Sequence, residues 1–101
     1  MTSSKRNNVA QIVAGRIRAE KVRLTVHARD KMRQEQVMIP EIEDVLASGW
    51  HVPEYDEWSE EHCTWNYAIE GHTSDDRKFR IAVSFAANDD VVIVTVIELN
   101  G

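Results

Sequence analysis

The sequence predicts an α+β domain in which N-terminal helices pack on a three- to four-stranded antiparallel sheet. Two observations predict this class. In the first half of the chain, apolar residues recur every three or four positions, which is typical of amphipathic helices. In the second half they alternate with polar residues, which is typical of strands. Helices followed by a run of strands favour an α+β domain over alternating α/β units.

The first helix is expected to begin after Asn7 or Asn8, either of which could act as the N-cap. Its apolar residues are spaced by three and four positions and form one stripe: Val9, Ile12, Val13 and Ile17. A third helix is expected over residues 40–48, because Pro40 fits the first helical turn and Gly49 is a natural C-cap.

Between these helices lies a basic stretch, residues 25–35, which we expect to form the second helix with Thr25 as its N-cap. Ala28 and Met32 are four residues apart and form the packing face. His27 lies on a neighbouring stripe together with cations. A side chain that titrates near neutral pH beside cations suits acid–base chemistry. The alternative is a histidine that only hydrogen-bonds a backbone carbonyl and fixes its helix.

The second half is expected to form strands joined by turns. A short edge strand is predicted over residues 51–55, because Pro53 cannot donate a hydrogen bond within a central ladder. An acidic loop is predicted over residues 57–63, and Trp50 and Trp65 are expected in the core. Two longer strands are predicted over residues 64–70 and 79–85, where apolar residues alternate with polar ones. A third is predicted over residues 91–99, which form a long run rich in β-branched residues.

Length and composition bound the possible classes. The 101 residues suit one domain with one core, and we expect a frayed terminus over residues 1–6. A single cysteine, Cys63, cannot form an internal disulfide and is typical of a reducing compartment. The chain has neither an apolar run of ~20 residues nor the apolar segment of a signal peptide. We therefore expect a cytoplasmic protein that does not contact a membrane.

Charge is distributed unevenly along the chain. The net charge is −5, yet residues 1–36 carry nine Lys or Arg against three acids, whereas residues 37–101 carry three against fourteen. A local basic face could meet nucleic-acid phosphates while the acidic remainder favours solubility. The alternative, that these charges only solvate helix faces, is equally consistent with the composition.

These residues resemble a known family. The run from His27 to Met32, the acidic helix ending at Gly49, the strand ending at Gly71 and the turn with Arg77 are similar in order and spacing to domain-of-unknown-function family 4258. The similarity covers roughly residues 20–99. That family is similar to the ribonuclease toxins of bacterial toxin–antitoxin systems, the RelE, MqsR and barnase-like group.

The resemblance implies helices packed on a twisted antiparallel sheet, metal-independent cleavage of RNA, and inhibition by a partner antitoxin. It implies no cofactor. A base must take the 2′-hydroxyl proton, an acid must protonate the leaving oxygen, and cations must stabilise the charged phosphorane. The residues expected to serve catalysis are His27, Lys31 and Arg77. Those expected to bind the substrate are Arg29, Arg33, Tyr67 and Arg80.

Three positions depart from the family pattern. Lys31 replaces an arginine, which keeps the charge but loses the planar fork that suits phosphate. Gln36 replaces a second arginine, and Asp76 adds a negative charge beside Arg77. These departures leave open a second hypothesis, a non-catalytic protein-interaction module that retains the ribonuclease-toxin fold. A homodimer through the sheet edge near Pro53 is a third possibility.

Two further groups of residues could bind a metal or a partner. His62, Cys63 and His72 lack the paired spacing of a zinc site, so no metal is expected. The acidic segment over residues 54–61 contains Tyr55 and Trp58, and if exposed these aromatics would suit a protein partner or a platform for base stacking.

Overall fold

The structure is a computed structural model that describes residues 5–99. The helices are α1 (Val9–Arg18), α2 (Val26–Glu35) and α3 (Ile39–Ser48), with a 3₁₀ turn η1 (Pro53–Tyr55). The strands are β1 (Val22–Leu24), β2 (Trp50–His51), β3 (Glu57–Ser59), β4 (Thr64–His72), β5 (Lys78–Phe85) and β6 (Val91–Glu98). The strand order is β1-β6-β5-β4-β2, and β3 pairs with β4. This arrangement confirms the predicted α+β class.

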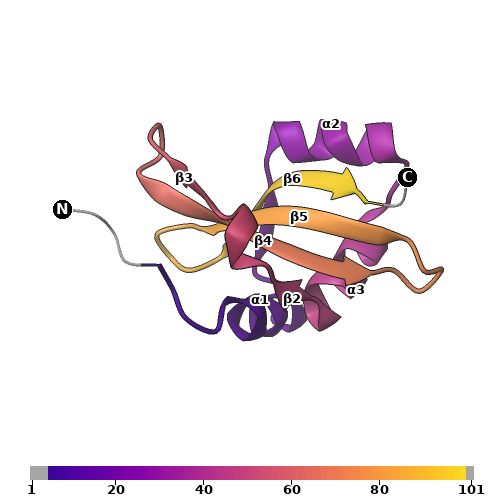
Figure 1. Ribbon diagram of the computed structural model, residues 1–101, viewed down its shortest axis with the longest axis horizontal. Helices are drawn as coiled ribbons and strands as arrows, with labels where there is room; N and C mark the ends of the chain where they lie inside the picture. Colours follow the sequence, from indigo (N-terminus) through magenta and orange to yellow (C-terminus); the bar gives the residue numbers. More distant parts are fainter. Residues whose placement is uncertain (1–4, 100–101) are drawn as a thin grey trace.

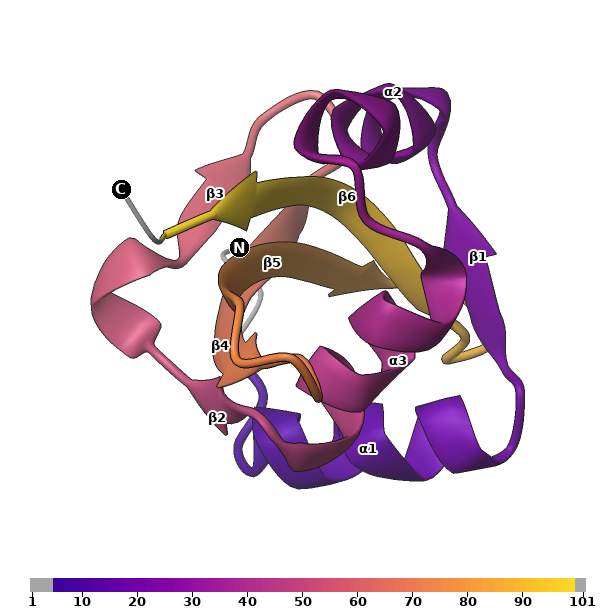
Figure 2. The same cartoon turned by 90° about the vertical axis from the view of Figure 1, so that its right-hand side faces the viewer.

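The sheet curls around α3. The long strands β4, β5 and β6 are antiparallel neighbours, as predicted, whereas β1 runs parallel to β6. Figures 1 and 2 show α3 inside the curl, α1 packed against α3, and α2 lying along β6. The other face of β4–β6, which we call the outer face, lies between α2 at one margin and the β3–β4 hairpin with η1 at the other (Figure 1).

Helical periodicity identified the core-facing side of each helix. Thr25 caps α2 as predicted, because its Oγ1 accepts a hydrogen bond from the backbone N–H of Ala28 at 3.0 Å. Asn8 occupies the N-cap position of α1, but its side chain makes no capping hydrogen bond. Buried apolar residues come from all three helices and meet those of β4–β6: Val9, Val13, Ile17, Ala28, Met32, Ile42, Val45 and Leu46.

The short strands differ from the sequence prediction. The edge strand expected over 51–55 is only the two-residue β2, followed by η1, and the expected acidic loop over 57–63 contains β3. No strand is predicted from the sequence over residues 22–24, which form β1. Each of these strands has two or three residues and exists because it pairs with a distant strand. Two or three residues are too few to show an alternating pattern in the sequence.

The expected burial of Trp50 is wrong. Trp50 lies on the edge strand β2 and is 44% exposed. Its indole ring lies near the imidazole ring of His72 and the ammonium group of Lys78. Burial of a tryptophan depends on which face of its strand meets the core, and a two-residue strand gives no alternation from which to infer this. Trp65 is partly buried and packs against the core, as expected.

The expected frayed terminus falls partly on residues 1–4, which lie outside the described residues. Lys5 and Arg6 are instead held by contacts. Lys5 Nζ lies 2.8 Å from Asp56 Oδ2, and the backbone N–H of Arg6 donates to the hydroxyl of Tyr67 at 2.8 Å. Within residues 5–99 no helix is both long enough and apolar enough to span a bilayer.

Candidate functional site

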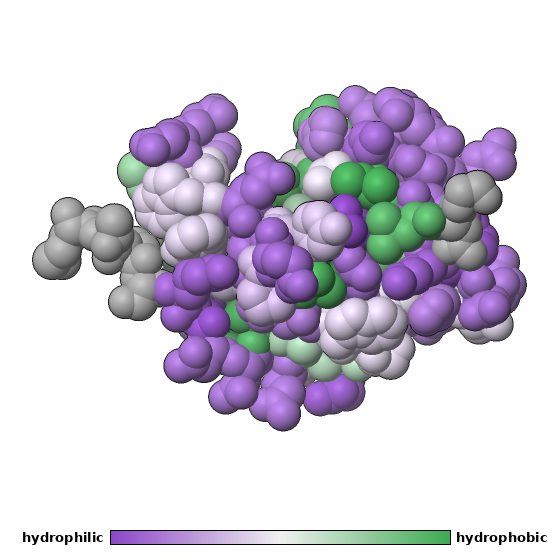
Figure 3. Space-filling model, viewed as in Figure 1, coloured by the Kyte–Doolittle hydropathy of each residue, from purple (hydrophilic) through white to green (hydrophobic). Residues whose placement is uncertain are grey.

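A groove crosses the outer face of the sheet between α2 and the β3–β4 hairpin. It consists of two hollows of about 230 and 320 Å³, whose linings share Asn66 and Val94. His27 lines the smaller hollow and His62 lines the larger one. The space-filling view shows the outline of the molecule notched between the hairpin and α2 (Figure 3). We call these two hollows together the outer-face groove.

In the smaller hollow a histidine and a carboxylate share one concave surface. His27 lies in the first turn of α2, and its Nε2 is 3.2 Å from Oγ1 of Thr95 on β6. Thr95 pairs with Ala82 of β5, and both line the hollow. Glu57 and Tyr55 complete the lining from β3 and η1. His27 and Glu57 can therefore both reach one bound ligand as proton donor and acceptor.

Cationic side chains lie beside this hollow. Arg80 stacks on Tyr55, with its Cζ 3.6 Å from the ring centroid, and its Nε donates to Glu70 Oε2 at 2.9 Å. Because Arg80 and Ala82 point to the same face of β5, they are about 7 Å apart along the strand. Since the ion pair with Glu70 uses Nε, the two Nη atoms can donate to an anion. Lys31 lies one turn after His27 on the same side of α2.

A buried carboxylate fixes the wall that carries Tyr55 and Glu57. The side chain of Asp56 is only 1% exposed. Its oxygens lie 2.8 Å from His51 Nε2 and 2.8 Å from Lys5 Nζ, and one accepts from the backbone N–H of Ala68 at 2.9 Å. These contacts tie η1 to β2 and β4, so that the residues on either side of Asp56 project towards the groove from a fixed position.

The larger hollow offers hydrogen-bonding groups that are not used within the fold. In the described part of the chain, the side-chain amide of Asn66 has no hydrogen-bond partner, and it lies where the two hollows meet. Thr64 and Ser84 also line this hollow. Among residues 5–99, no group of three or more His, Cys, Asp or Glu side chains is placed to hold a metal ion. The groove therefore offers polar side chains and two histidines to a ligand.

Comparison with known proteins identifies the family. A family model described as a domain of unknown function, DUF4258, matches residues 24–98.

The chain belongs to this family.

The DUF4258 region begins just before α2 and ends with β6, so it includes both margins of the outer-face groove and leaves α1 outside. No curated protein and no solved structure matches the chain.

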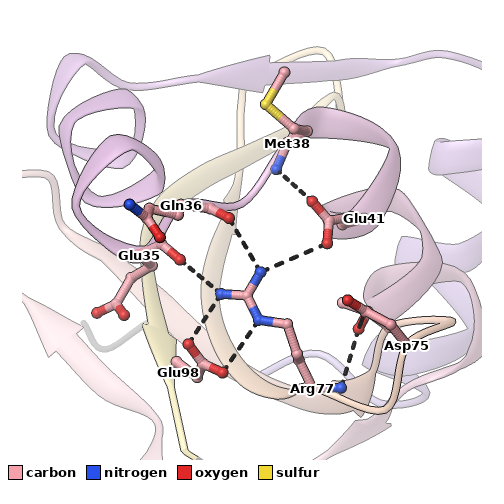
Figure 4. Close-up of polar contacts among 8 residues, drawn as sticks. Glu35, Gln36, Met38, Glu41, Asp75, Arg77 and Glu98 are labelled. Atoms are coloured by element: carbon pink, nitrogen blue, oxygen red, sulfur yellow. Dashed lines mark hydrogen bonds and ion pairs between the residues drawn. The ribbon is translucent and has the colours of Figure 1, made fainter.

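Within the DUF4258 region, Arg77 occupies a separate structural position (Figure 4). Its guanidinium donates to both carboxylate oxygens of Glu98, at 2.9 and 3.2 Å, and to the backbone carbonyls of Glu35 and Gln36 at the end of α2. His27 lies eight residues before Glu35 in the same helix, which corresponds to about 12 Å along its axis. The expected meeting of Arg77 with His27 therefore does not occur, because Arg77 caps the opposite end of α2.

Three of the four residues expected to bind the substrate lie away from the outer-face groove. Tyr67 is buried in the core face of β4, and its hydroxyl accepts from the Arg6 backbone. Arg29 and Arg33 lie on the other side of α2 from His27, where they line a different groove. Of the predicted residues, the structure thus groups His27, Lys31 and Arg80 at the outer face.

Sequence reasoning missed part of the groove. His62 was considered only as a metal ligand, Glu57 only as part of an acidic loop, and Asn66 and Thr95 not at all. The alternation of β4 does place Asn66 on the face opposite Tyr67, which was an available signal. The approach of Thr95 to His27 depends on the position of α2 on β6, for which the sequence has no local signal.

Replacing Arg77 should test its structural role. The bond with Arg77 lowers the pKa of Glu98, and the bond with Glu98 raises the pKa of Arg77. We expect Arg77→Met to lower the melting temperature at pH 7 by more than about 5 °C, because one carboxylate and two carbonyls lose their donor. The matched control Arg33→Met, which removes an exposed ion pair with Asp30, should change the melting temperature by at most about 3 °C.

The same pair predicts a pH dependence. A carboxylate with a lowered pKa in the folded state stabilises the fold above its unfolded pKa of about 4.3, and this contribution is lost as pH falls through the folded value. The difference in melting temperature between wild type and Arg77→Met should therefore shrink below about pH 4. A difference equal to that of the control at pH 7, or one that grows on acidification, would contradict this assignment.

Proposed function

We propose that this DUF4258 chain is a metal-independent endoribonuclease, similar to the RelE, MqsR and barnase-like toxins, which acts on RNA in the bacterial cytoplasm and is inhibited by a partner antitoxin. The observation that carries the proposal is that His27 and Glu57 line one hollow beside Arg80. We place the active site in the outer-face groove.

In this proposal the chemistry is carried out by four side chains: His27, Glu57, Arg80 and Lys31. One of His27 and Glu57 takes the proton of the ribose 2′-hydroxyl, whose oxygen then bonds to the adjacent phosphorus. The bond from phosphorus to the 5′ oxygen breaks, and the other residue returns a proton to that oxygen. The products are a 2′,3′-cyclic phosphate and a 5′-hydroxyl. Arg80 and Lys31 stabilise the negative charge of the phosphorane.

Thr95 and Tyr55 have supporting roles in this proposal. The contact between Thr95 and Nε2 fixes the orientation of the His27 ring. Tyr55 holds the guanidinium of Arg80 by stacking, and Glu70 fixes its Nε by accepting a hydrogen bond. This fixed geometry would aim the two Nη atoms at a phosphate with little loss of side-chain entropy.

Expression and purified-protein assays test the proposal together. The wild-type protein should arrest growth when expressed and should degrade RNA in the presence of EDTA, and His27→Ala should abolish both effects. If wild type and His27→Ala behave alike in both assays, the proposal fails.

A second candidate function is a non-catalytic interaction module that retains the fold. It is favoured by the observation that Arg77 is engaged by Glu98 and by two carbonyls, and that Gln36 brings no cation. Under this alternative the protein forms a stable complex with another protein, while its preparations leave RNA intact in EDTA and its expression leaves growth unaffected.

A further inference from the structure

A second groove runs along the side of α2 that faces away from His27. One hollow of about 340 Å³ lies between α2 and the start of α3, and another of about 410 Å³ lies beside β1. Their linings share Leu24, Arg29 and Ile39, so the two hollows form one continuous surface. We call it the α2–α3 groove. Each hollow is large enough to receive several side chains of a ligand.

The floor and rim of the first hollow are apolar. Met32 and Val37 are buried beneath it, at 7% and 3% exposure. Met38 and Ile39 form part of its rim and are 68% and 48% exposed, among the most exposed large apolar side chains in the described part of the chain. Large apolar side chains left in solvent around an apolar hollow indicate a binding surface.

Two arginines flank this apolar surface. Arg29 lies where the two hollows meet, and within residues 5–99 its guanidinium makes no ion pair or hydrogen bond. Among the same residues, the one ion pair of Arg33 is an exposed pair with Asp30, at 3.3 Å. The acids of the groove, Glu20 and Glu43, line the β1 hollow alone. The first hollow therefore combines apolar contact with available positive charge.

We infer that the α2–α3 groove binds an acidic, amphipathic segment of a second protein. Apolar side chains of that segment would fill the first hollow, and its carboxylates would pair with Arg29 and Arg33. Charge complementarity of this kind sets partner choice and orientation.

Two other occupants fit less well. RNA would need aromatic surfaces for its bases, and among the described residues neither hollow has an aromatic side chain in its lining. A second copy of the chain bound about a two-fold axis through this groove would place the same patch on both partners. Both copies would then bring Arg29 and Arg33 into one interface, which concentrates positive charge there, and like charges repel.

The inference does not depend on RNA cleavage, because the groove lies on the opposite side of α2 from His27. A suitable probe is a phage-displayed library of random 16-residue peptides, selected on the full-length wild-type protein. We expect the selected peptides to be enriched in Asp, Glu and large apolar residues. Arg29→Glu should weaken their binding at least tenfold, as measured by fluorescence anisotropy.

Two variants control for indirect effects. Arg18→Glu reverses another exposed charge, on α1 and outside both hollows, and should leave peptide binding within about twofold. Met38→Gln removes apolar rim contact without changing charge and should also weaken binding, so the result does not rest on a single variant. Circular dichroism confirms that each variant is folded.

Three outcomes would overturn the inference. Selected peptides that lack acidic residues would remove the charge argument. Binding that is equally sensitive to Arg18→Glu would show non-specific attraction to positive charge on the surface of the helices. Sedimentation that shows a homodimer dissociated by Met38→Gln would assign the groove to a second copy of the chain instead.

Discussion

Replacing His27 with glutamine should lower the rate of RNA cleavage by about 10²- to 10⁴-fold, the contribution typical of a general acid or base. Glutamine keeps a polar side chain of similar reach that can still hydrogen-bond Thr95, but it cannot carry a proton between reacting atoms. Because His27 is exposed on α2, its replacement should leave the melting temperature nearly unchanged. The measurement is the initial cleavage rate of a fluorescent RNA oligonucleotide in EDTA.

His72 provides the matched control for this substitution. It is an exposed histidine at the end of β4, with its ring against Trp50, and it lines neither hollow of the outer-face groove. His72→Gln should retain the wild-type rate. If the two substitutions reduce the rate equally, the loss does not arise from chemistry at His27.

Replacing Gly49 with alanine should destabilise the fold by about 1–3 kcal/mol. A Cβ at this position would lie 2.5 Å from the carbonyl oxygen of Val45 and 2.6 Å from that of Glu70. Both are backbone atoms. Relief of the contact with Glu70 requires the end of α3 to move away from β4, whereas relief of the contact with Val45, which lies in α3 itself, requires the backbone to change direction at the helix end. Gly49 was predicted as a helix C-cap, and it does follow α3, but its backbone is extended. The tight exit of the chain from α3 and its close approach to β4 together require glycine.

Gly15 gives the opposite prediction from the same substitution. A Cβ on Gly15 would meet no atom within 4 Å outside its own helix. Gly15→Ala should therefore stabilise the protein by up to ~1 kcal/mol, through the higher helix propensity of alanine and the lower entropy of the unfolded chain. Urea denaturation of both variants measures the two changes. If both substitutions changed the free energy of unfolding in the same direction, the packing account would be contradicted.

Local patterns in the sequence predicted the parts of the fold that local physics determines. Thr25 caps α2, Ala28 and Met32 pack, and the alternating residues of β4–β6 separate the core face from the outer face. These features depend on a few neighbouring residues. The three short strands could not be predicted in the same way, because each is defined by its partner rather than by its own two or three residues.

The site was predicted less completely than the fold. His27 could be singled out because a histidine beside cations on a helix is visible in the sequence. The sequence could not exclude Arg77 from the catalytic site, because its partners include backbone carbonyls at the C-terminal end of α2. These carbonyls are available because the helix ends at Gln36, which has a left-handed φ of 54°. Glu57 and Thr95 join the site only through strand pairing and the position of α2 on β6.

The chemical identity of the cleavage products tests the central claim most directly. Purified protein is incubated in EDTA with an RNA oligonucleotide and with the same oligonucleotide carrying 2′-O-methyl groups, and the ends are identified by mass spectrometry. Our account predicts that the RNA alone is cut, leaving 2′,3′-cyclic phosphate and 5′-hydroxyl ends. Intact RNA, cleavage of the methylated strand, or 5′-phosphate ends would contradict it.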